Sequence, residues 1–287
     1  MDKMELKALG KINLGLDVLG RRENGYHDVR MVMQTVYLYD QIRIEKTKKP
    51  GIELSTNLFY LPVNENNLAY QAADLLMKEF DVKEGVKITL DKHIPVAAGM
   101  AGGSSNAAAV LFGINRMFSL GLSQKELMER GVTLGADVPY CVMRGTVLAE
   151  GIGEKLTRLA PMPFCHMVVA KPPINVSTKM VYDSLDSGAI TKHPDIDGII
   201  EAINEGSVIK IAERMGNVLE DVTIPLYPVI DKIKKDMISQ GAYNAMMSGS
   251  GPTVFGIFPD EQTALNCKEY LKRQGDARQV YITETFN

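Results

Sequence analysis

Hydrophobic and polar residues alternate along several short segments of the N-terminal half. From Ile12 to Val18 every second residue is apolar, and 86–90 repeats the pattern. Segments 29–39 and 41–46 are rich in Val, Ile, Tyr and Met, which favour strands. A period of two places alternate side chains on one face of a sheet. We therefore predict strands over these four segments, as parts of a mixed sheet.

A helical period replaces this alternation elsewhere in the same half. Apolar residues recur at helical spacing over 66–80, after an asparagine pair suited to capping a helix. Helical spacing returns over 104–118 and again over 123–134, where Ser123 and Glu126 have the spacing of a capping box. These patterns predict three helices that pack their apolar faces against the sheet.

The order of elements changes after 159–163, a proline-containing segment that we interpret as a linker. The elements predicted beyond it are, in order, a strand at 165–171, helices within 177–240, strands at 243–247 and 253–258, a helix at 261–273 and a strand at 279–284. With extra helices in its first crossover, the order β-α-β-β-α-β is that of the split ferredoxin-like motif. We predict an α+β protein with two domains, 1–160 and 161–287.

Composition narrows the classes of function. The formal net charge of -3 over 287 residues gives no basic field that would attract nucleic acid or anionic lipid. The N-terminus lacks the pattern of a secretory signal, and the cysteines Cys141, Cys165 and Cys267 have no paired spacing. The four histidines never reach metal-ligand spacing. We predict a soluble cytoplasmic protein without a protein-built metal site and without nucleic-acid, membrane or obligate protein partners.

The strongest chemical signal is the glycine-rich segment Pro95–Ser105, between a predicted strand and a predicted helix. Small residues let the backbone approach a ligand, and the N–H groups of a helix start favour phosphate. Ser104 and Ser105 add hydroxyl groups for phosphate or for a magnesium ion bound to it. A turn that only packs a helix tightly is the alternative, and neither a Walker A lysine nor a G-x-G-x-x-G pattern is present.

Two further segments are ambiguous when taken alone. Met247–Phe255 places small residues before a strand, which is typical of a turn with a bulge as much as of a ligand loop. Lys11 and Asn13 lie on one side of a predicted strand because side chains repeat with period two. A strand lysine is usually solvated.

Taken in order, these three segments resemble the motifs of the GHMP kinases, over nearly the whole chain. The glycine-rich segment matches the family pattern P-x-x-x-G-x-x-x-G-S-S, although Ala98 and Ala101 stand where some relatives have glycine. The resemblance implies an N-terminal domain similar to ribosomal protein S5 and a C-terminal ferredoxin-like domain. It also implies ATP as phosphoryl donor, with Mg²⁺.

Two further segments resemble one branch of this family more closely: Arg21-x-x-x-Gly25-Tyr26-His27 and the run 134–139, Leu-Gly-Ala-Asp-Val-Pro. That branch phosphorylates the 2-hydroxyl of 4-(cytidine 5'-diphospho)-2-C-methyl-D-erythritol in the non-mevalonate route to isoprenoid precursors. The resemblance therefore implies a small-molecule kinase with this substrate. A homoserine or mevalonate type of kinase and a catalytically silent sensor remain alternatives.

The resemblance also assigns roles to residues. Lys11 and Asp137 match the catalytic pair, with Asp137 as proton acceptor or orienting group and Lys11 keeping it ionised. Without the motif, Asp137 reads as a turn residue. The implied ATP-binding residues are Asn66, Pro95, Val96, Ala97, Ala98, Gly99, Met100, Ala101, Gly102, Gly103, Ser104 and Ser105. The implied substrate-binding residues are Asn13, Tyr26, His27, Thr178 and Tyr182. For Tyr182, a structural role in core packing is the alternative to substrate binding.

Overall fold

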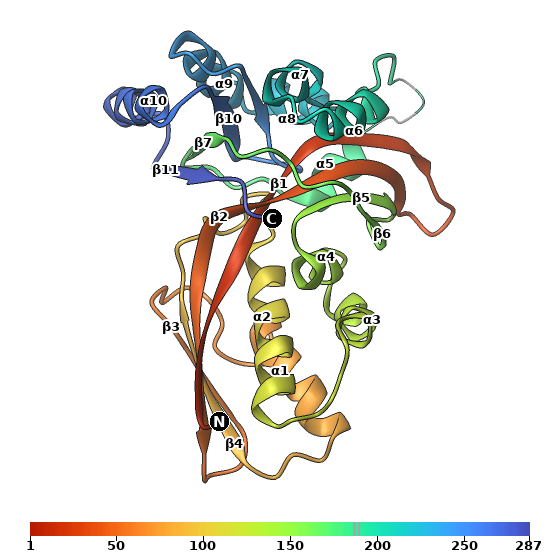
Figure 1. The fold of residues 1–287 in the computed structure, drawn as a ribbon, viewed down its shortest axis with the longest axis vertical. Coiled ribbons are helices and arrows are strands. Elements are labelled where there is room, and N and C mark those ends of the chain that lie inside the picture. Colours follow the sequence, from red (N-terminus) through yellow and green to blue (C-terminus); the bar gives the residue numbers. More distant parts are fainter. Residues whose placement is uncertain (186–187, 189) are drawn as a thin grey trace. The chain divides into compact units, whose positions relative to one another are not determined.

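A computed structural model describes residues 1–185, 188 and 190–287 (Figure 1). They form two compact units, neither of them continuous in sequence. The first consists of Met1–Gly10, Leu38–Val96 and Ala101–Met143, and the second of Lys11–Tyr37, Ala97–Met100 and Arg144–Asn287. Two long strands, β1 (Lys3–Arg21) and β2 (His27–Thr47), contribute residues to both units. The predicted domain division at residue 160 stays a prediction.

The first unit contains a mixed sheet, as the alternating segments predicted. Its remaining elements are β3 (Ile52–Thr56), α1 (Leu68–Glu79), β4 (Gly85–Asp91), α2 (Gly102–Met117), α3 (Gln124–Leu134) and α4 (Val138–Met143). The strand order within the unit is β3-β4-β2-β1. β3 runs parallel to β4, whereas β2 runs antiparallel to it. Each sheet face therefore collects the alternate apolar side chains of several strands.

The strand β2 corrects one sequence expectation. The sequence predicts two strands, 29–39 and 41–46, with Asp40 between them. The structure has one continuous strand through Asp40, whose side chain is 0% exposed. The backbone groups of Asp40 can pair in the strand while its side chain forms hydrogen bonds of its own. A buried polar residue with such partners therefore does not end a strand.

The helix starts in the first unit confirm the predicted capping residues. Asn67 accepts a hydrogen bond from Ala69 N at 3.0 Å at the start of α1, and Ser123 and Glu126 form both halves of a capping box at α3. α2 begins at Gly102, two residues before the predicted start, and packs against α1. Gly113 permits close packing of α2 on the sheet, since an added Cβ would lie 2.4 Å from Ile44 Cδ1.

The second unit contains a four-stranded antiparallel sheet besides its share of β1 and β2. Its elements are β5 (Thr146–Gly151), β6 (Lys155–Arg158), β7 (His166–Lys171), α5 (Thr178–Ser184), α6 (Ile196–Asn204), α7 (Val208–Arg214), β8 (Gly216–Asn217), α8 (Glu220–Leu226), α9 (Val229–Ser239), β9 (Asn244–Met247), β10 (Val254–Phe258), α10 (Glu261–Gln274) and β11 (Gln279–Glu284). Residues 186, 187 and 189, within the region predicted as helical, lie outside the described residues.

The strand order in this sheet is β11-β7-β10-β9, and each neighbouring pair is antiparallel. β7 and β9 are therefore parallel to each other with β10 between them, which is the split arrangement predicted from the element order. The helices α9 and α10 pack against these strands (Figure 1). The ferredoxin-like fold of this region is confirmed.

Several short elements were not predicted: β3, β5, β6, α4 and β8, which lies within the region predicted as helical. Each has few residues, so its own sequence pattern is weak compared with the pairing that stabilises it. β3 is held by the parallel ladder with β4, and β6 by the antiparallel ladder with β5. Short strands gain their stability from such neighbours and not from local propensity.

Candidate functional site

The second unit brings together the N-terminal lysine segment, part of the glycine-rich segment and the segment 247–255. Lys11 N donates to Met100 O at 3.2 Å, and the Ser248 hydroxyl donates to Gly99 O at 2.9 Å. Gly99 has a φ of +69°, and an added Cβ would lie 2.0 Å from Ser248 O. Only glycine permits this approach, because a Cβ would overlap a backbone atom. The three segments singled out by sequence therefore form one structural group.

Asn217, in β8, holds the segment 247–255 in place. Its buried amide donates to Met247 O at 2.9 Å and to Gly249 O at 2.8 Å, while its carbonyl oxygen accepts from Leu219 N at 3.0 Å. These bonds give hydrogen-bond partners to one carbonyl at the end of β9 and one in the turn that follows it. Sequence reasoning missed Asn217, because an asparagine between predicted helices carries no distinguishing pattern.

Lys11 lies on β1 beside this group with its side chain buried. Its ammonium donates to Asn13 Oδ1 at 2.8 Å and lies 3.6 Å from where a Cβ on Gly249 would be. Asn13 is 0% exposed, and its amide donates to Met31 Sδ at 3.2 Å. A buried cation bonded to a neutral amide is suited to receive an anionic group. Lys11 is therefore not the solvated strand lysine that its sequence context alone suggests.

The start of α2, in the first unit, has the character of an anion-binding helix terminus. Ala101 occupies the N-cap position with a left-handed φ of 54° and offers no polar side chain to the first-turn N–H groups. Ser104 is half-buried. Ser105 is buried and donates its hydroxyl proton to Leu9 O at 2.6 Å. The Ser104 hydroxyl has no such bond among the described residues, so Ser104 is the better placed of the two serines to donate to a ligand.

The remaining residues of the glycine-rich segment vary in exposure. Pro95, Ala98 and Met100 are buried, Val96, Gly99, Ala101 and Gly102 are half-buried, and Ala97 and Gly103 are exposed. Ala97, like Ala101, has a positive φ, of 50°. Two alanines in the left-handed region are unusual for residues with a Cβ, and the conformation costs each about 1 kcal/mol.

Replacing Ala101 with glycine should raise the free energy of unfolding by about 1 kcal/mol, since glycine adopts the left-handed conformation without strain. Urea denaturation measures the change. Ala108→Gly, inside α2 where the backbone is helical, is the matched control and should lower stability by about 1 kcal/mol. Loss of stability in both variants would show that Ala101 is not strained.

His27 and Tyr182 form the aromatic part of the second unit's candidate site. Their ring centroids lie 5.3 Å apart with an interplanar angle of 40°. His27 is 6% exposed, and its Nε2 atom is buried without a hydrogen-bond partner among the described residues. Burial lowers the pKa of His27, and the charge of Arg21 lowers it further while Asp183 opposes them. The imidazole is thus neutral near pH 7, with an unused polar atom.

Tyr26 and Thr178 complete the predicted substrate residues. Tyr26 precedes His27 and is 59% exposed, so its ring is free to cover a ligand. Thr178 is the first residue of α5, and its hydroxyl is 2.8 Å from the Ser250 hydroxyl. Tyr182 lies one helical turn after Thr178 on the same face of α5. The helix α5 therefore links the aromatic pair to the segment 247–255.

Asp137 and Asn66 belong to the first unit. Asp137 is half-buried in the turn between α3 and α4, and its carbonyl accepts the bond from Cys141 N, at 3.0 Å, that starts α4. Asn66 is exposed before α1, and its amide donates to Asn64 Oδ1 at 3.3 Å. The roles assigned to both residues by family resemblance stay predictions.

Two other features are absent from the part of the chain that the structure describes. No three His, Cys, Asp or Glu side chains lie together as metal ligands within residues 1–185, 188 and 190–287. Within the same residues, no helix has the length and apolarity needed to cross a membrane.

Comparison with known families identifies the fold. Residues 67–145 match the GHMP kinases N terminal domain, and residues 192–277 match the GHMP kinases C terminal family. The chain belongs to the GHMP kinases. The glycine-rich segment lies inside the first match, and the predicted family and fold class are confirmed. As a GHMP kinase the chain is an enzyme of the phosphotransferase type, for which the family implies ATP as phosphoryl donor.

Individual GHMP kinases show the degree of similarity. The 4-diphosphocytidyl-2-C-methyl-D-erythritol kinase of Lachnospira eligens is 65% identical over 286 residues, covering 100% of this chain and 99% of that protein. The crystal structure of 4-(cytidine 5'-diphospho)-2C-methyl-D-erythritol kinase matches with a TM-score of 0.86 and 31% identity, covering 99% of this chain and 100% of the other. A homoserine kinase from Cytophaga hutchinsonii reaches 0.79 at 19% identity, covering 100% and 95%, which shows the shared fold alone.

Proposed function

We propose that this GHMP kinase transfers the γ-phosphoryl group of ATP to the 2-hydroxyl of 4-(cytidine 5'-diphospho)-2-C-methyl-D-erythritol, giving the 2-phosphate and ADP. Full-length identity of 65% to a relative named for this substrate supports the proposal. The observation in this chain that carries it is the buried Nε2 of His27, which lies beside the Tyr182 ring and has no hydrogen-bond partner among the described residues. A neutral imidazole beside an aromatic side chain suits the planar, polar edge of a cytosine base.

In the proposed reaction, the oxygen of the acceptor hydroxyl forms a bond to the γ-phosphorus as the bond to the bridging oxygen of ADP breaks. Asp137 accepts the hydroxyl proton or orients the hydroxyl for attack. Lys11 contributes the buried positive charge that favours ionised groups near it. Asp137 belongs to the first compact unit and Lys11 to the second, and the role of each residue is proposed by itself.

The nucleotide triphosphate is assigned to the glycine-rich segment and the start of α2. First-turn N–H groups with no capping side chain at Ala101 suit phosphate oxygens. Mg²⁺ would neutralise phosphate charge, bound mainly by phosphate oxygens and water with the Ser104 hydroxyl as protein ligand. This mode of binding needs no cluster of carboxylates. We place the reaction in the cytoplasm and propose no obligate protein partner.

A magnesium-dependent ADP-release assay with a panel of acceptors tests the proposal. We expect turnover with the cytidine compound, and far lower kcat/KM with homoserine and mevalonate. Preference for either of these acceptors would overturn the substrate and leave a kinase of another specificity. Binding of nucleotide without turnover of any acceptor would favour a silent sensor.

Replacing His27 with alanine should raise KM for the cytidine acceptor roughly tenfold or more, since losing the partner of a buried polar edge costs about 1–3 kcal/mol. Steady-state kinetics with cytidine and uridine forms of the acceptor measure the effect, and the variant should discriminate less between the two bases. His166→Ala, at the start of β7, is the control and should leave KM within about twofold. An unchanged KM in His27→Ala would remove His27 from base recognition.

A further inference from the structure

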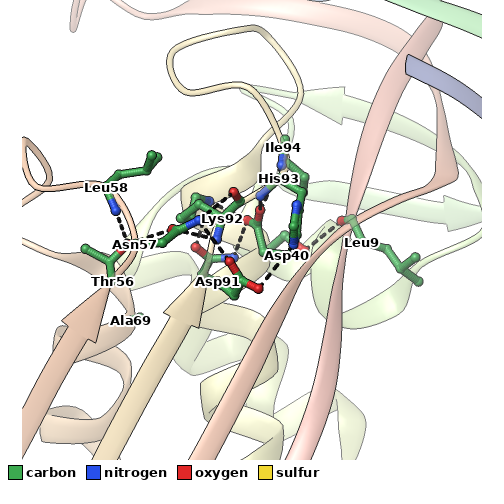
Figure 2. Close-up of polar contacts among 12 residues, drawn as sticks. Leu9, Asp40, Thr56, Asn57, Leu58, Ala69, Asp91, Lys92, His93 and Ile94 are labelled. Carbon is green, nitrogen blue, oxygen red and sulfur yellow. Dashed lines mark hydrogen bonds and ion pairs between the residues drawn. The ribbon is translucent and has the colours of Figure 1, made fainter. Parts of the chain in front are cut away.

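Asp40 is a fully buried carboxylate in β2, and the reaction proposed above assigns it no direct role (Figure 2). Its Oδ1 accepts from His93 N at 2.7 Å and from Ile94 N at 2.8 Å. Its Oδ2 accepts from Asn106 Nδ2 at 2.7 Å and forms an ion pair with the Lys92 ammonium. A buried carboxylate persists only when such donors replace its hydration.

The donors come from both sides of the glycine-rich segment Pro95–Ser105. His93 and Ile94 directly precede it, and Asn106 directly follows it near the start of α2. Lys92 joins the two sides a second time, because its ammonium bonds to Asn106 Oδ1 at 2.9 Å as well as to Asp40. These residues, Asp40, Lys92, Asn106 and the N–H groups of 93–94, form what we name the Asp40 cluster.

Neighbouring contacts fix the cluster in the first unit. Asn57, after β3, accepts from Lys92 N at 2.9 Å and donates to Asp91 Oδ1 at 2.8 Å, as Figure 2 shows. Gly102, the first residue of α2, lies over the cluster, since an added Cβ there would be 3.4 Å from Lys92 Nζ. The cluster therefore joins β2, the end of β4 and the start of α2.

We propose that Asp40 is a positioning residue for nucleotide binding, which closes both ends of the glycine-rich segment so that its N–H groups are ordered before ATP arrives. The proposal rests on the kinase function proposed above. Fixing the ends of a loop in advance removes part of the ordering cost of binding. Asp40 acts through the segment and is not assigned any contact with the nucleotide.

The carboxylate of Asp40 only accepts hydrogen bonds, and the Lys92 ammonium only donates them. Lys92 is a cation near a phosphate-binding segment, but its ammonium is already paired with Asp40 and Asn106. Replacing Asp40 with asparagine keeps the acceptor for 93–94, yet turns an amide donor toward the ammonium and the Asn106 amide. The introduced amide then faces two other donors, the Lys92 ammonium and the Asn106 amide. The hydrogen bonds that connect the two ends of the glycine-rich segment are lost.

The decisive measurement is the dissociation constant of a non-hydrolysable ATP analogue with magnesium, by calorimetry, in Asp40→Asn. We expect it to rise about tenfold, which corresponds to about 1.4 kcal/mol, with KM for ATP rising in parallel. KM for the acceptor should stay within about twofold, because the cluster lies only at the ends of the glycine-rich segment.

A compensating exchange separates positioning from general stability. In the double variant Asp40→Asn, Asn106→Asp, the amide at 40 accepts from 93–94 and donates to the carboxylate at 106, and Lys92 again has an anionic partner. We expect the analogue affinity to return to within about threefold of wild type, as complementary pairs couple strongly. Ile88→Val, a core change in β4, controls for lost stability alone and should bind the analogue like wild type.

Each outcome bears on the proposal. The proposal is overturned if folded Asp40→Asn binds the ATP analogue as tightly as wild type. It is also overturned if the double variant folds but binds the analogue as weakly as Asp40→Asn does. If Asp40→Asn does not fold, Asn106→Ala removes one link only, and unchanged affinity there overturns the proposal as well. Analogue binding needs no acceptor, so a wild type that binds the analogue without phosphorylating the cytidine compound refutes the proposed substrate alone.

Discussion

Replacing Asp137 with asparagine should lower kcat by about 10²–10⁴-fold, because the amide cannot accept the proton of the acceptor hydroxyl. Asparagine has nearly the same volume and can still occupy the turn before α4, so the protein should fold and bind ATP as before. Steady-state ADP release gives kcat, and calorimetry gives the affinity for the nucleotide analogue. A kcat within about tenfold of wild type would remove Asp137 from the chemical step.

Comparison with alanine separates the two roles left open for Asp137. A proton acceptor predicts that Asp137→Asn and Asp137→Ala lose the same activity, since neither can take the proton. An orienting group predicts that asparagine retains more activity than alanine, because its oxygen still accepts a hydrogen bond. Asp260→Asn is the matched control: Asp260 caps α10 and is exposed, asparagine caps equally well, and kcat should not change.

Replacing Gly99 with alanine should lower the free energy of unfolding by about 2–4 kcal/mol, from overlap with a backbone atom and from left-handed strain. The added Cβ would lie 2.0 Å from Ser248 O, and the φ of Gly99 is +69°. The segments around Gly99 and Ser248 must then separate, so nucleotide affinity should fall too. Urea denaturation and analogue calorimetry measure the two effects.

Gly121→Ala measures the cost of left-handed backbone strain without the steric overlap that is present in Gly99→Ala. Gly121 has a similar φ of +77°, but nothing lies within 4 Å of an added Cβ. That variant should lose only about 1 kcal/mol and keep full analogue affinity. Equal stability losses in Gly99→Ala and Gly121→Ala would mean that the close approach of Gly99 to Ser248 contributes nothing.

The longer elements could be predicted from local patterns because their physical cause is local. Alternation over 86–90 marks a strand with one buried face, and the Ser123–Glu126 capping box marks a helix start. Alternation over 12–18 also marks a strand, although the structure buries both of its faces. The order of elements after residue 165 was enough to predict the split sheet, since a parallel pair with a strand between them needs that connectivity. Local sequence thus determined these elements and the fold class.

The candidate site was predictable where residue type itself carries the chemistry. The glycines and serines of Pro95–Ser105 indicate a phosphate-binding turn, and Lys11 and Asp137 entered through family resemblance. Asp40 and Asn217 carried no such signal. Asp40 lies between the two strands predicted at 29–39 and 41–46, which the structure joins into β2. Such residues become recognisable only when their partners are known.

The sequence by itself determined the family, the main strands and helices and the glycine-rich segment, since periodicity, capping and backbone freedom act between near neighbours. The tertiary structure alone decided that Ser248 contacts Gly99 and that Asn217 bonds to Met247 O and Gly249 O. It also decided that Asp40 joins 93–94 to Asn106. These contacts join residues that are far apart in the chain and become neighbours only in the folded structure. A buried polar group needs a hydrogen-bond partner, and the fold determines which residue supplies it.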